Sequence, residues 1–279
     1  MQIPFTKMHG LGNDFVVINN LQKQFKLSKA HIQQLAHRNT GIGFDQLLLV
    51  EKPRNQQADF FYRIFNADGS EIAQCGNGAR CFARFVYKRR LTRKKTITVE
   101  TIQGLLTLQI AVNGLVTVNM GIPKFEPSAV PFICEQAAEL YHLKVAGNEL
   151  KLTTLAIGNP HAVILVEDIT GIAIYDIGRA LNCHPQFPEG VNVGFMQILA
   201  PNNIRLRVYE RGTGETLACG SGACAAVVAG RLLRLLAPEQ VTVNFPLGSL
   251  QVHWQGKHQP VWLTGSAVHV FEGIIDLND

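Results

Sequence analysis

Two of the six cysteines, Cys75 and Cys219, stand in closely similar local sequences. Each follows a turn-forming segment and precedes a Gly-x-Gly step and a run with helical apolar spacing. Each thiol is therefore expected at the first turn of a helix, where unpaired backbone N–H groups and the helix dipole favour an anion. Such a position lowers the pKa of a cysteine. The chemistry expected is proton transfer, because a thiol with an unperturbed pKa near ~8.5 can serve as acid or base at neutral pH.

Two thiols that face each other across a cleft can invert a carbon stereocentre. One thiolate removes a proton from one face of the carbon while the other thiol donates a proton to the opposite face. Helix N-termini bind carboxylates and stabilise negative charge that develops in a transition state. The backbone amides expected to do this here belong to Gly76, Asn77, Gly220 and Ser221.

The cysteines belong to an internal repeat, in which residues 65–79 align without a gap on residues 209–223. Glu, Cys, Gly, Gly and Ala recur at matched positions, and 279 residues suffice for two domains. We predict an N-terminal domain of residues 1–119, to which a C-terminal strand in 266–279 is added, and a second domain of residues 120–265. The active site is expected in the cleft between them.

Each repeat has the pattern of a strand, a turn, a helix and further strands. Residues 62–65 alternate like a strand, and residues 79–86 have helical apolar spacing. Residues 219–230 carry no charge, which predicts a buried helix. Residues 96–100 and 241–245 alternate like half-buried strands. The predicted fold class is α+β, with two pseudo-symmetric domains, each a mostly antiparallel sheet or barrel wrapped around a central helix.

Composition excludes several other classes of protein. No apolar stretch approaches the ~20 residues needed to cross a bilayer, and no leader pattern is visible, so a cytoplasmic protein without a membrane partner is expected. The net charge of +5 comes partly from the basic run 88–95, interpreted as a solvated helix end and turn, so no nucleic-acid partner is expected. The spacing of the cysteines does not fit a zinc site, and no metal is expected.

Several segments together resemble the signature sequences of the diaminopimelate epimerase family. The resemblance covers essentially the whole chain. It is carried by residues 65–71 with 74–81, 210–216 with 218–223, and by 7–15, 43–46 and 158–161.

The resemblance implies interconversion of LL- and meso-2,6-diaminopimelate without pyridoxal phosphate, metal or any other cofactor, in bacterial lysine and peptidoglycan-precursor synthesis. Cys75 and Cys219 would be the acid/base pair, and His161 and Glu210 would stand near the thiols and help set which one is ionised. The residues implied to bind substrate are Asn13, Gln46, Asn66, Gly76, Asn77, Asn159, Asn192, Glu210, Arg211, Gly220 and Ser221.

These residue types suit a substrate with two zwitterionic ends. Arg211 can hold a distal carboxylate with two hydrogen bonds, Glu210 can meet an ammonium, and the Asn side chains can pair with either group. The family resemblance also implies a homodimer. One departure is Phe271, which stands where many members have a tyrosine and so removes a hydroxyl from a strand expected to help form the homodimer in the family.

Two alternatives are weighed against this interpretation. Another cofactor-independent racemase of the same fold, of the proline racemase or hydroxyproline epimerase type, would use the same thiols, but a proline ring lacks the second charged end. The other alternative is a non-enzymatic module that binds a phosphate or a nucleotide at the glycine-rich helix starts. The glycines complete neither a dinucleotide fingerprint nor a Walker loop, which disfavours that module.

Overall fold

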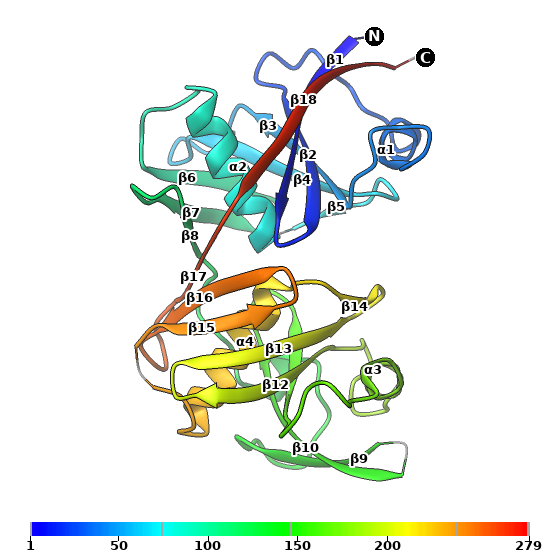
Figure 1. Cartoon of the computed structure of the whole chain (residues 1–279), viewed down its shortest axis with the longest axis vertical. Coiled ribbons are helices and arrows are strands. Elements are labelled where there is room, and N and C mark those ends of the chain that lie inside the picture. The colour runs from blue at the N-terminus through cyan, green and yellow to red at the C-terminus, as the bar shows by residue number, and fades with distance from the viewer. Residues whose placement is uncertain (1, 74, 146, 238, 278–279) are drawn as a thin grey trace. The chain divides into compact units, whose positions relative to one another are not determined.

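The structure is a computed structural model that describes residues 2–73, 75–145, 147–237 and 239–277. Gln74 of the motif quoted above, and Met1, Asn278 and Asp279 of the predicted N-terminal domain, lie outside the described residues. The chain forms two compact units (Figure 1). Unit 1 comprises Met1–Asn119 and Thr264–Asp279, and unit 2 comprises Met120–Leu263.

Unit 1 begins and ends with strands that pair with each other. Strand β18 lies antiparallel to β1, so the C-terminal segment returns to the N-terminal unit. The elements of unit 1 are β1 (Gln2–Gly10), β2 (Asn13–Asn19), α1 (Lys29–Ala36), β3 (Gln46–Glu51), β4 (Phe60–Asn66), β5 (Glu71–Ile72), α2 (Gly76–Lys88), β6 (Thr96–Thr101), β7 (Gly104–Ile110), β8 (Val116–Asn119) and β18 (Val268–Asp276).

The sheet of unit 1 is antiparallel except where β2 pairs with β3 and β4 pairs with β6. Helix α2 contacts β1, β2, β3, β7 and β8, which come from both ends of the strand order. The sheet therefore wraps around this helix. Helix α1 begins with a capping box at Ser28 and packs Ile32 and Leu35 onto the outer side of the sheet, in a separate apolar cluster.

Unit 2 repeats this plan. Its elements are η1 (Pro127–Ala129), β9 (Tyr141–Val145), β10 (Asn148–Ala156), β11 (Pro160–Leu165), α3 (Ile174–Asn182), β12 (Asn192–Ala200), β13 (Asn203–Glu210), β14 (Gly214–Thr216), α4 (Gly220–Leu232), β15 (Val241–Phe245) and β16 (Gly248–Trp254); β17 (Val261–Gly265) ends in unit 1. Parallel pairing recurs at β11–β12 and β13–β15, the positions matched to those in unit 1. Helix α4 contacts β10, β11, β12, β13, β15 and β16.

The predicted α+β class, with two repeated units each built around a central helix, is confirmed. The uncharged segment predicted to be a buried helix forms most of α4, and Gly220 and residues 222–230 are buried. Such a helix is stable only because sheet surrounds it, since it has no polar face to present to water. Helix α2 differs because Arg80 lies at its buried face with no exposed surface.

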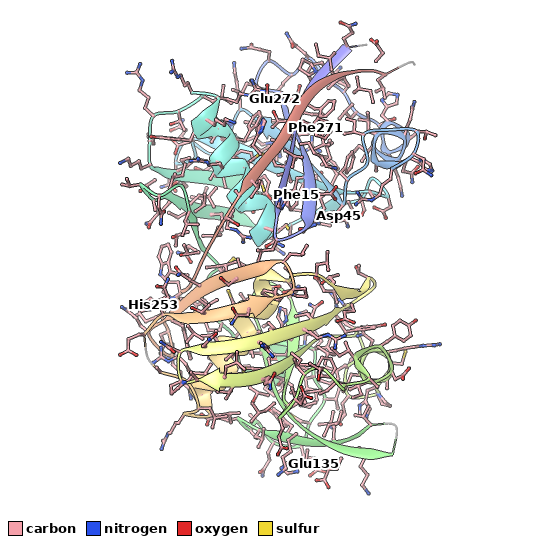
Figure 2. The ribbon with its side chains drawn as sticks, viewed as in Figure 1. Phe15, Asp45, Glu135, His253, Phe271 and Glu272 are labelled. Carbon is pink, nitrogen blue, oxygen red and sulfur yellow. The ribbon has the colours of Figure 1, made fainter. Side chains whose placement is uncertain are left out.

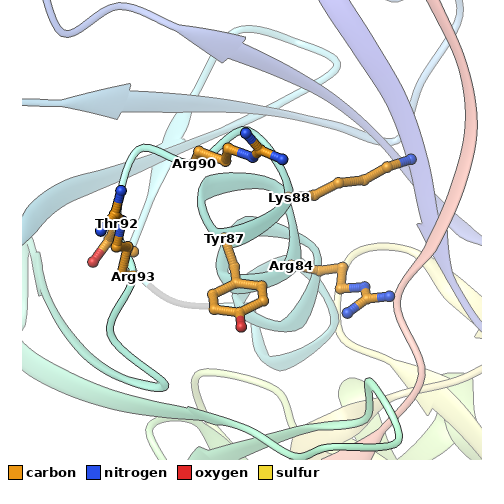
Figure 3. A pocket seen from close by; sticks show the side chains of 6 residues that line it. All are labelled: Arg84, Tyr87, Lys88, Arg90, Thr92 and Arg93. Carbon is orange, nitrogen blue, oxygen red and sulfur yellow. The ribbon is translucent and has the colours of Figure 1, made fainter.

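The basic run lies at the C-terminal end of α2 and in the turn that follows. The helix ends at Lys88, and Arg90 takes a left-handed conformation with φ 56°. The predicted helix end and turn are confirmed. Side chains from this region line an open hollow of about 640 Å³ (Figure 3), formed by Arg84, Tyr87, Lys88, Arg90, Thr92 and Arg93. Among the described residues, no helix is both long and apolar enough to cross a bilayer.

Candidate active site

Cys75 is the residue that precedes helix α2, and its side chain caps the helix. Its backbone is extended, with φ −143°, and its Sγ accepts a hydrogen bond from the N–H of Gly78 at 3.4 Å. The carboxamide oxygen of Asn13 lies 3.8 Å from the same sulfur. Burial raises the pKa of Tyr62, so its hydroxyl stays protonated and donates to the Cys75 carbonyl at 3.4 Å. The thiol thus stands at a helix N-terminus with a side-chain amide beside it.

A chain of side chains supports this thiol from inside unit 1. Asn77 donates to Asn13 Oδ1 at 3.3 Å, and Arg80 donates to Asn77 Oδ1 at 2.9 Å. The Arg80 guanidinium also donates to the carbonyls of Gly76 and Ser266, at 3.3 and 3.1 Å. A buried charge requires such acceptors. Arg80 therefore fixes the first turn of α2 to the segment that leads into β18.

Gln46 and Asn66 form a second group in unit 1. They are directly opposite each other on β3 and β4, and the Gln46 amide donates to Asn66 Oδ1 at 3.0 Å. Asn66 donates in turn to Ser70 Oγ at 3.2 Å. Gln46 Oε1 is buried and accepts no hydrogen bond from any described residue. It is therefore an acceptor available for an N–H or ammonium donor.

Cys219 holds the matching position before α4, and its surroundings are different. Its Sγ–H donates to Glu210 Oε2 at 3.2 Å, and Ser221 Oγ lies 3.6 Å from the sulfur. Glu210 Oε1 accepts a hydrogen bond from the Thr216 hydroxyl at 2.5 Å. Cys219, Glu210 and Ser221 are therefore brought together within unit 2.

The expectation that a helix start lowers the pKa of the thiol is wrong for Cys219. Burial and the negative charge of Glu210 raise the pKa of Cys219 well above its ordinary value. The hydrogen bonds that Ser221 and the Gly222 N–H offer the sulfur act in the opposite direction and are outweighed. Cys219 is accordingly a protonated thiol, the form that donates a proton.

The second glycine of each Gly-x-Gly step lies close against neighbouring side chains. A Cβ at Gly78 would overlap the Tyr62 hydroxyl, and a Cβ at Gly222 would lie 3.1 Å from a methyl group of Val208 and 3.3 Å from Cys219 Cβ. The first glycines, Gly76 and Gly220, are the first residues of α2 and α4.

His161 and Asn159 meet at the start of β11. His161 Nε2 lies 2.9 Å from Asn159 Oδ1, an oxygen that only accepts, so Nε2 carries the proton. Burial, with a smaller effect from the Arg211 charge, lowers the pKa of His161 to about 3. The imidazole is therefore neutral at physiological pH.

Asn192 and Arg211 form the remaining group of unit 2. Asn192 Oδ1 accepts the backbone N–H of Arg211 at 2.9 Å, and the Asn192 amide donates to the Pro160 carbonyl at 3.0 Å. The Arg211 guanidinium donates to the Glu189 carbonyl at 2.9 Å. A guanidinium has five N–H donors, and this bond uses one of them. Arg211 can therefore also donate hydrogen bonds to a carboxylate.

Sequence reasoning missed three residues in these groups. Arg80 has no role in the sequence-based interpretation, although a charge at a position that the second repeat fills with the uncharged Cys224 is a signal for a buried partner. Tyr62 and Thr216 gave no signal of this kind. Among the described residues, no three His, Cys, Asp or Glu side chains are grouped so that they could hold a metal ion.

The fold defines a class of proteins with two repeated units, each of which here has a cysteine at the N-cap position of its central helix. A hydroxyproline epimerase from Agrobacterium vitis has a similar fold, with a TM-score of 0.73 over 100% of this chain and 93% of the other. The sequences are only 15% identical, so this likeness concerns the fold alone.

Sequence comparison gives the family. The chain is 55% identical to the diaminopimelate epimerase of Nitrosomonas europaea, over 99% of this chain and 100% of the relative. It is also 55% identical to that of Nitrosomonas eutropha, over 99% and 100%. The family model described as "Diaminopimelate epimerase" matches residues 5–126 and 153–270. The chain therefore belongs to the diaminopimelate epimerase family, as the signature segments indicated, and it is an isomerase.

Proposed function

We propose that the protein epimerises LL-2,6-diaminopimelate to meso-2,6-diaminopimelate, in lysine and peptidoglycan-precursor synthesis. The observation that carries the proposal is the pair of matched cysteines, each at the N-cap position of the central helix of one unit, in a chain of this family. One thiolate takes the α-proton, and the other thiol gives its proton to the opposite face of the carbon. The thiols exchange protonation states, so that no net acid or base is consumed.

In this proposal the protonated Cys219 is the donor and Cys75 is the acceptor when the resting enzyme first meets substrate. The direction follows from Glu210, which is 3.2 Å from Cys219 and keeps that thiol protonated. The Sγ of Cys75 accepts a hydrogen bond from the Gly78 N–H, and such a bond favours the thiolate form. The reverse reaction starts from the exchanged protonation states.

We propose that the two zwitterionic ends of the substrate are held by the groups described above. The free acceptor of Gln46 suits an ammonium, and the free donors of Arg211 suit the distal carboxylate. The amides at the starts of α2 and α4 suit the α-carboxylate beside the reacting carbon. The full proposed set is Asn13, Gln46, Asn66, Gly76, Asn77, Asn159, Asn192, Glu210, Arg211, Gly220 and Ser221.

His161 is proposed to act as a neutral imidazole. Its Nε2–H donates to Asn159, and that bond orients the carboxamide that is proposed to meet substrate. With a pKa of about 3, His161 does not carry a proton to the reacting carbon at neutral pH. Its proposed part in catalysis is therefore to help set the environment of the thiols.

We further propose that residues 1–119 with 266–279, and residues 120–265, are the two domains, and that the active site lies in the cleft between them. This follows from the mechanism, which needs one thiol on each side of the stereocentre. In this proposal both domains take part in the same reaction, because each contributes one of the two catalytic thiols.

The reaction is tested by incubating LL-diaminopimelate with enzyme in deuterated water. We expect meso product to carry deuterium at the α-carbon while remaining LL substrate is initially unlabelled, because separate thiols handle the two faces. Cys75→Ser and Cys219→Ser are each expected to lower kcat by at least about 10³-fold. Cys183→Ser, at an exposed cysteine, is the control and should retain wild-type activity. Equal early labelling of substrate and product would contradict the two-thiol mechanism.

Specificity is tested in parallel with proline and 4-hydroxyproline stereoisomers. Neither supplies the second zwitterionic end that Arg211 and Gln46 are proposed to hold, so no turnover is expected. Turnover of proline with none of diaminopimelate would favour the proline racemase alternative.

A homodimer is proposed to form through β18. Figure 2 labels Phe271 and Glu272 on this strand, and Phe271 is 46% exposed although its ring packs edge-on against Phe5 at 5.9 Å. Val270 and Ile274 are 50% and 66% exposed. Exposed apolar side chains in a row are typical of an interface.

The dimer is tested by sedimentation velocity of the wild type and of Ile274→Asp. The variant is expected to sediment as a monomer, because dimer formation would bury the charged aspartate against apolar side chains, and removing a charge from water is costly in free energy. Val112→Asp changes a side chain that is 94% exposed in a turn and should leave the wild-type assembly intact. A monomeric wild type, or identical sedimentation of all three proteins, would contradict the proposal.

A further inference from the structure

The carboxylate of Glu210 lies between two donors, and each of its oxygens has one of them. Oε1 accepts the Thr216 hydroxyl at 2.5 Å, and Oε2 accepts the Cys219 thiol at 3.2 Å. A glutamate side chain has three rotatable bonds, so a single contact with a thiol, which is a weak donor, does not fix its orientation. The short hydrogen bond from Thr216 provides a second contact, which restrains the orientation of the Glu210 carboxylate.

Thr216 is itself held in place by its strand. It is the last residue of β14, which pairs antiparallel with β13, with Val208 opposite Thr216 and Gly214 opposite Glu210. The β-branched side chain of threonine has few rotamers. Both Thr216 and Glu210 are half-buried, so water competes less strongly for the bond between them.

The two repeats differ in sequence at the positions of this glutamate and this threonine. In the gapless alignment of the repeats, Thr216 corresponds to Ile72, and Glu210 corresponds to Asn66. Position 72 therefore offers no hydroxyl, and position 66 offers no carboxylate. Cys75 and Cys219 therefore occupy matched positions in the repeated backbone. The sequence differences at these two neighbouring positions give the two sulfurs different chemical surroundings.

We propose that Thr216 is a positioning residue, which fixes Glu210 with Oε2 toward Cys219 and so keeps this thiol in the donor form. Thr216 acts through Glu210 and does not touch the sulfur. The proposal rests on the proposed function for its catalytic consequence, but its first test does not need the epimerase reaction.

The first test measures the protonation of Cys219 directly. Glu210 is one cause of the raised pKa of Cys219, so releasing the carboxylate lowers that pKa and forms thiolate at lower pH. The rate of alkylation by iodoacetamide is followed at Cys219 and at Cys75 by peptide mass spectrometry from pH 6 to 10, in wild type, Thr216→Val and Thr216→Ser. Cys75 is the internal reference in each sample.

Thr216→Val keeps the shape and removes the hydroxyl, whereas Thr216→Ser keeps the hydroxyl and removes a methyl group. At pH 8, we expect iodoacetamide to alkylate Cys219 at least about threefold faster in Thr216→Val than in wild type. The alkylation rate of Cys75 should be the same in both proteins, and Thr216→Ser should match wild type at both cysteines. Coincident profiles for wild type and Thr216→Val would overturn the proposal. Equal acceleration in both variants would also overturn it, because it would reflect loosened packing.

The second test separates positioning from substrate binding. With diaminopimelate, Thr216→Val is expected to lower kcat about tenfold with KM changed less than twofold, and Thr216→Ser to restore kcat. A raised KM at unchanged kcat would contradict a role in proton transfer. Thr216→Ala provides the same deletion if the valine variant does not fold, as judged by circular dichroism. A wild type inactive on diaminopimelate would disprove the proposed function, while the alkylation profiles would still decide the role of Thr216.

Discussion

At the scale of single residues, the environment of each thiol decides its chemistry more than the helix start that both share. The helix start alone predicts two acidic thiols. In the structure, burial and the charge of Glu210 hold Cys219 protonated, and the amides of α4 do not offset them. The sequence contains Glu210 and Cys219 nine positions apart, but only the fold turns that spacing into a hydrogen bond of 3.2 Å.

His161 gives a stability prediction with a definite sign. Its pKa is about 3 in the folded protein and 6.5 when unperturbed, so between these values the unfolded chain binds more protons. The stability that His161 confers is therefore complete above pH 6.5 and is lost as pH falls toward 3, at up to about 1.4 kcal/mol per pH unit.

Replacing His161 with glutamine removes this titration and keeps an N–H donor for Asn159. Between pH 6 and pH 4, wild type should lose up to about 2 kcal/mol more of its unfolding free energy than His161→Gln. Urea unfolding at both pH values measures the difference. Parallel losses in the two proteins would show that the folded imidazole is protonated at pH 4.

At the scale of elements, the two central helices solve the same packing problem with different residues. Helix α4 carries no charge from Gly220 to Gly230, and most of this stretch is buried against its sheet. Helix α2 buries Arg80 at the position of Cys224 and uses its charge to join Asn77, the carbonyl of Gly76 and the carbonyl of Ser266. The guanidinium thus links the first turn of α2 to the chain end that completes unit 1.

Arg80→Met is expected to lower the free energy of unfolding by about 2–4 kcal/mol, because it leaves buried acceptors without their donor. It should also lower kcat, since Asn77 and Asn13 lose their support. Arg84→Met changes the same residue type one turn later, at a side chain that is only half-buried, and should alter stability by less than about 0.5 kcal/mol. Chemical denaturation of both variants measures the contrast, and equal losses would show that Arg80 contributes only its aliphatic stem.

Much of this element-level structure follows from the sequence, and the remainder has identifiable causes. The turn, cysteine and glycine spacing locates the starts of α2 and α4, and alternation locates β6 and β15, because these signals are local. Helix α1 was not predicted, although Ser28 provides its cap, since eight residues carry little periodicity. The roles of Arg80 and Thr216 depend on partners that only the fold brings near, such as Ser266 and Glu210.

At the scale of the whole molecule, the repeat explains how one chain provides a related pair of acid/base groups. Both units present a sulfur at the same point of the same topology, as the matched parallel pairs β4–β6 and β13–β15 show. Divergence at a few positions, such as Asn66 against Glu210, then makes the two sulfurs unequal without changing the backbone that carries them.

The proposed mechanism requires these sulfurs to approach the same carbon, which predicts that they can be joined by oxidation. Treatment with hydrogen peroxide should convert the two thiols to a disulfide, with water as the other product, and abolish activity; dithiothreitol should restore it. Peptide mapping should find Cys75 linked to Cys219 in wild type and in Cys183→Ser, which lacks an exposed thiol that could react instead. Because a disulfide requires Cα atoms within about 7 Å, full activity and unchanged thiol content after peroxide treatment would place the sulfurs too far apart for the proposed mechanism.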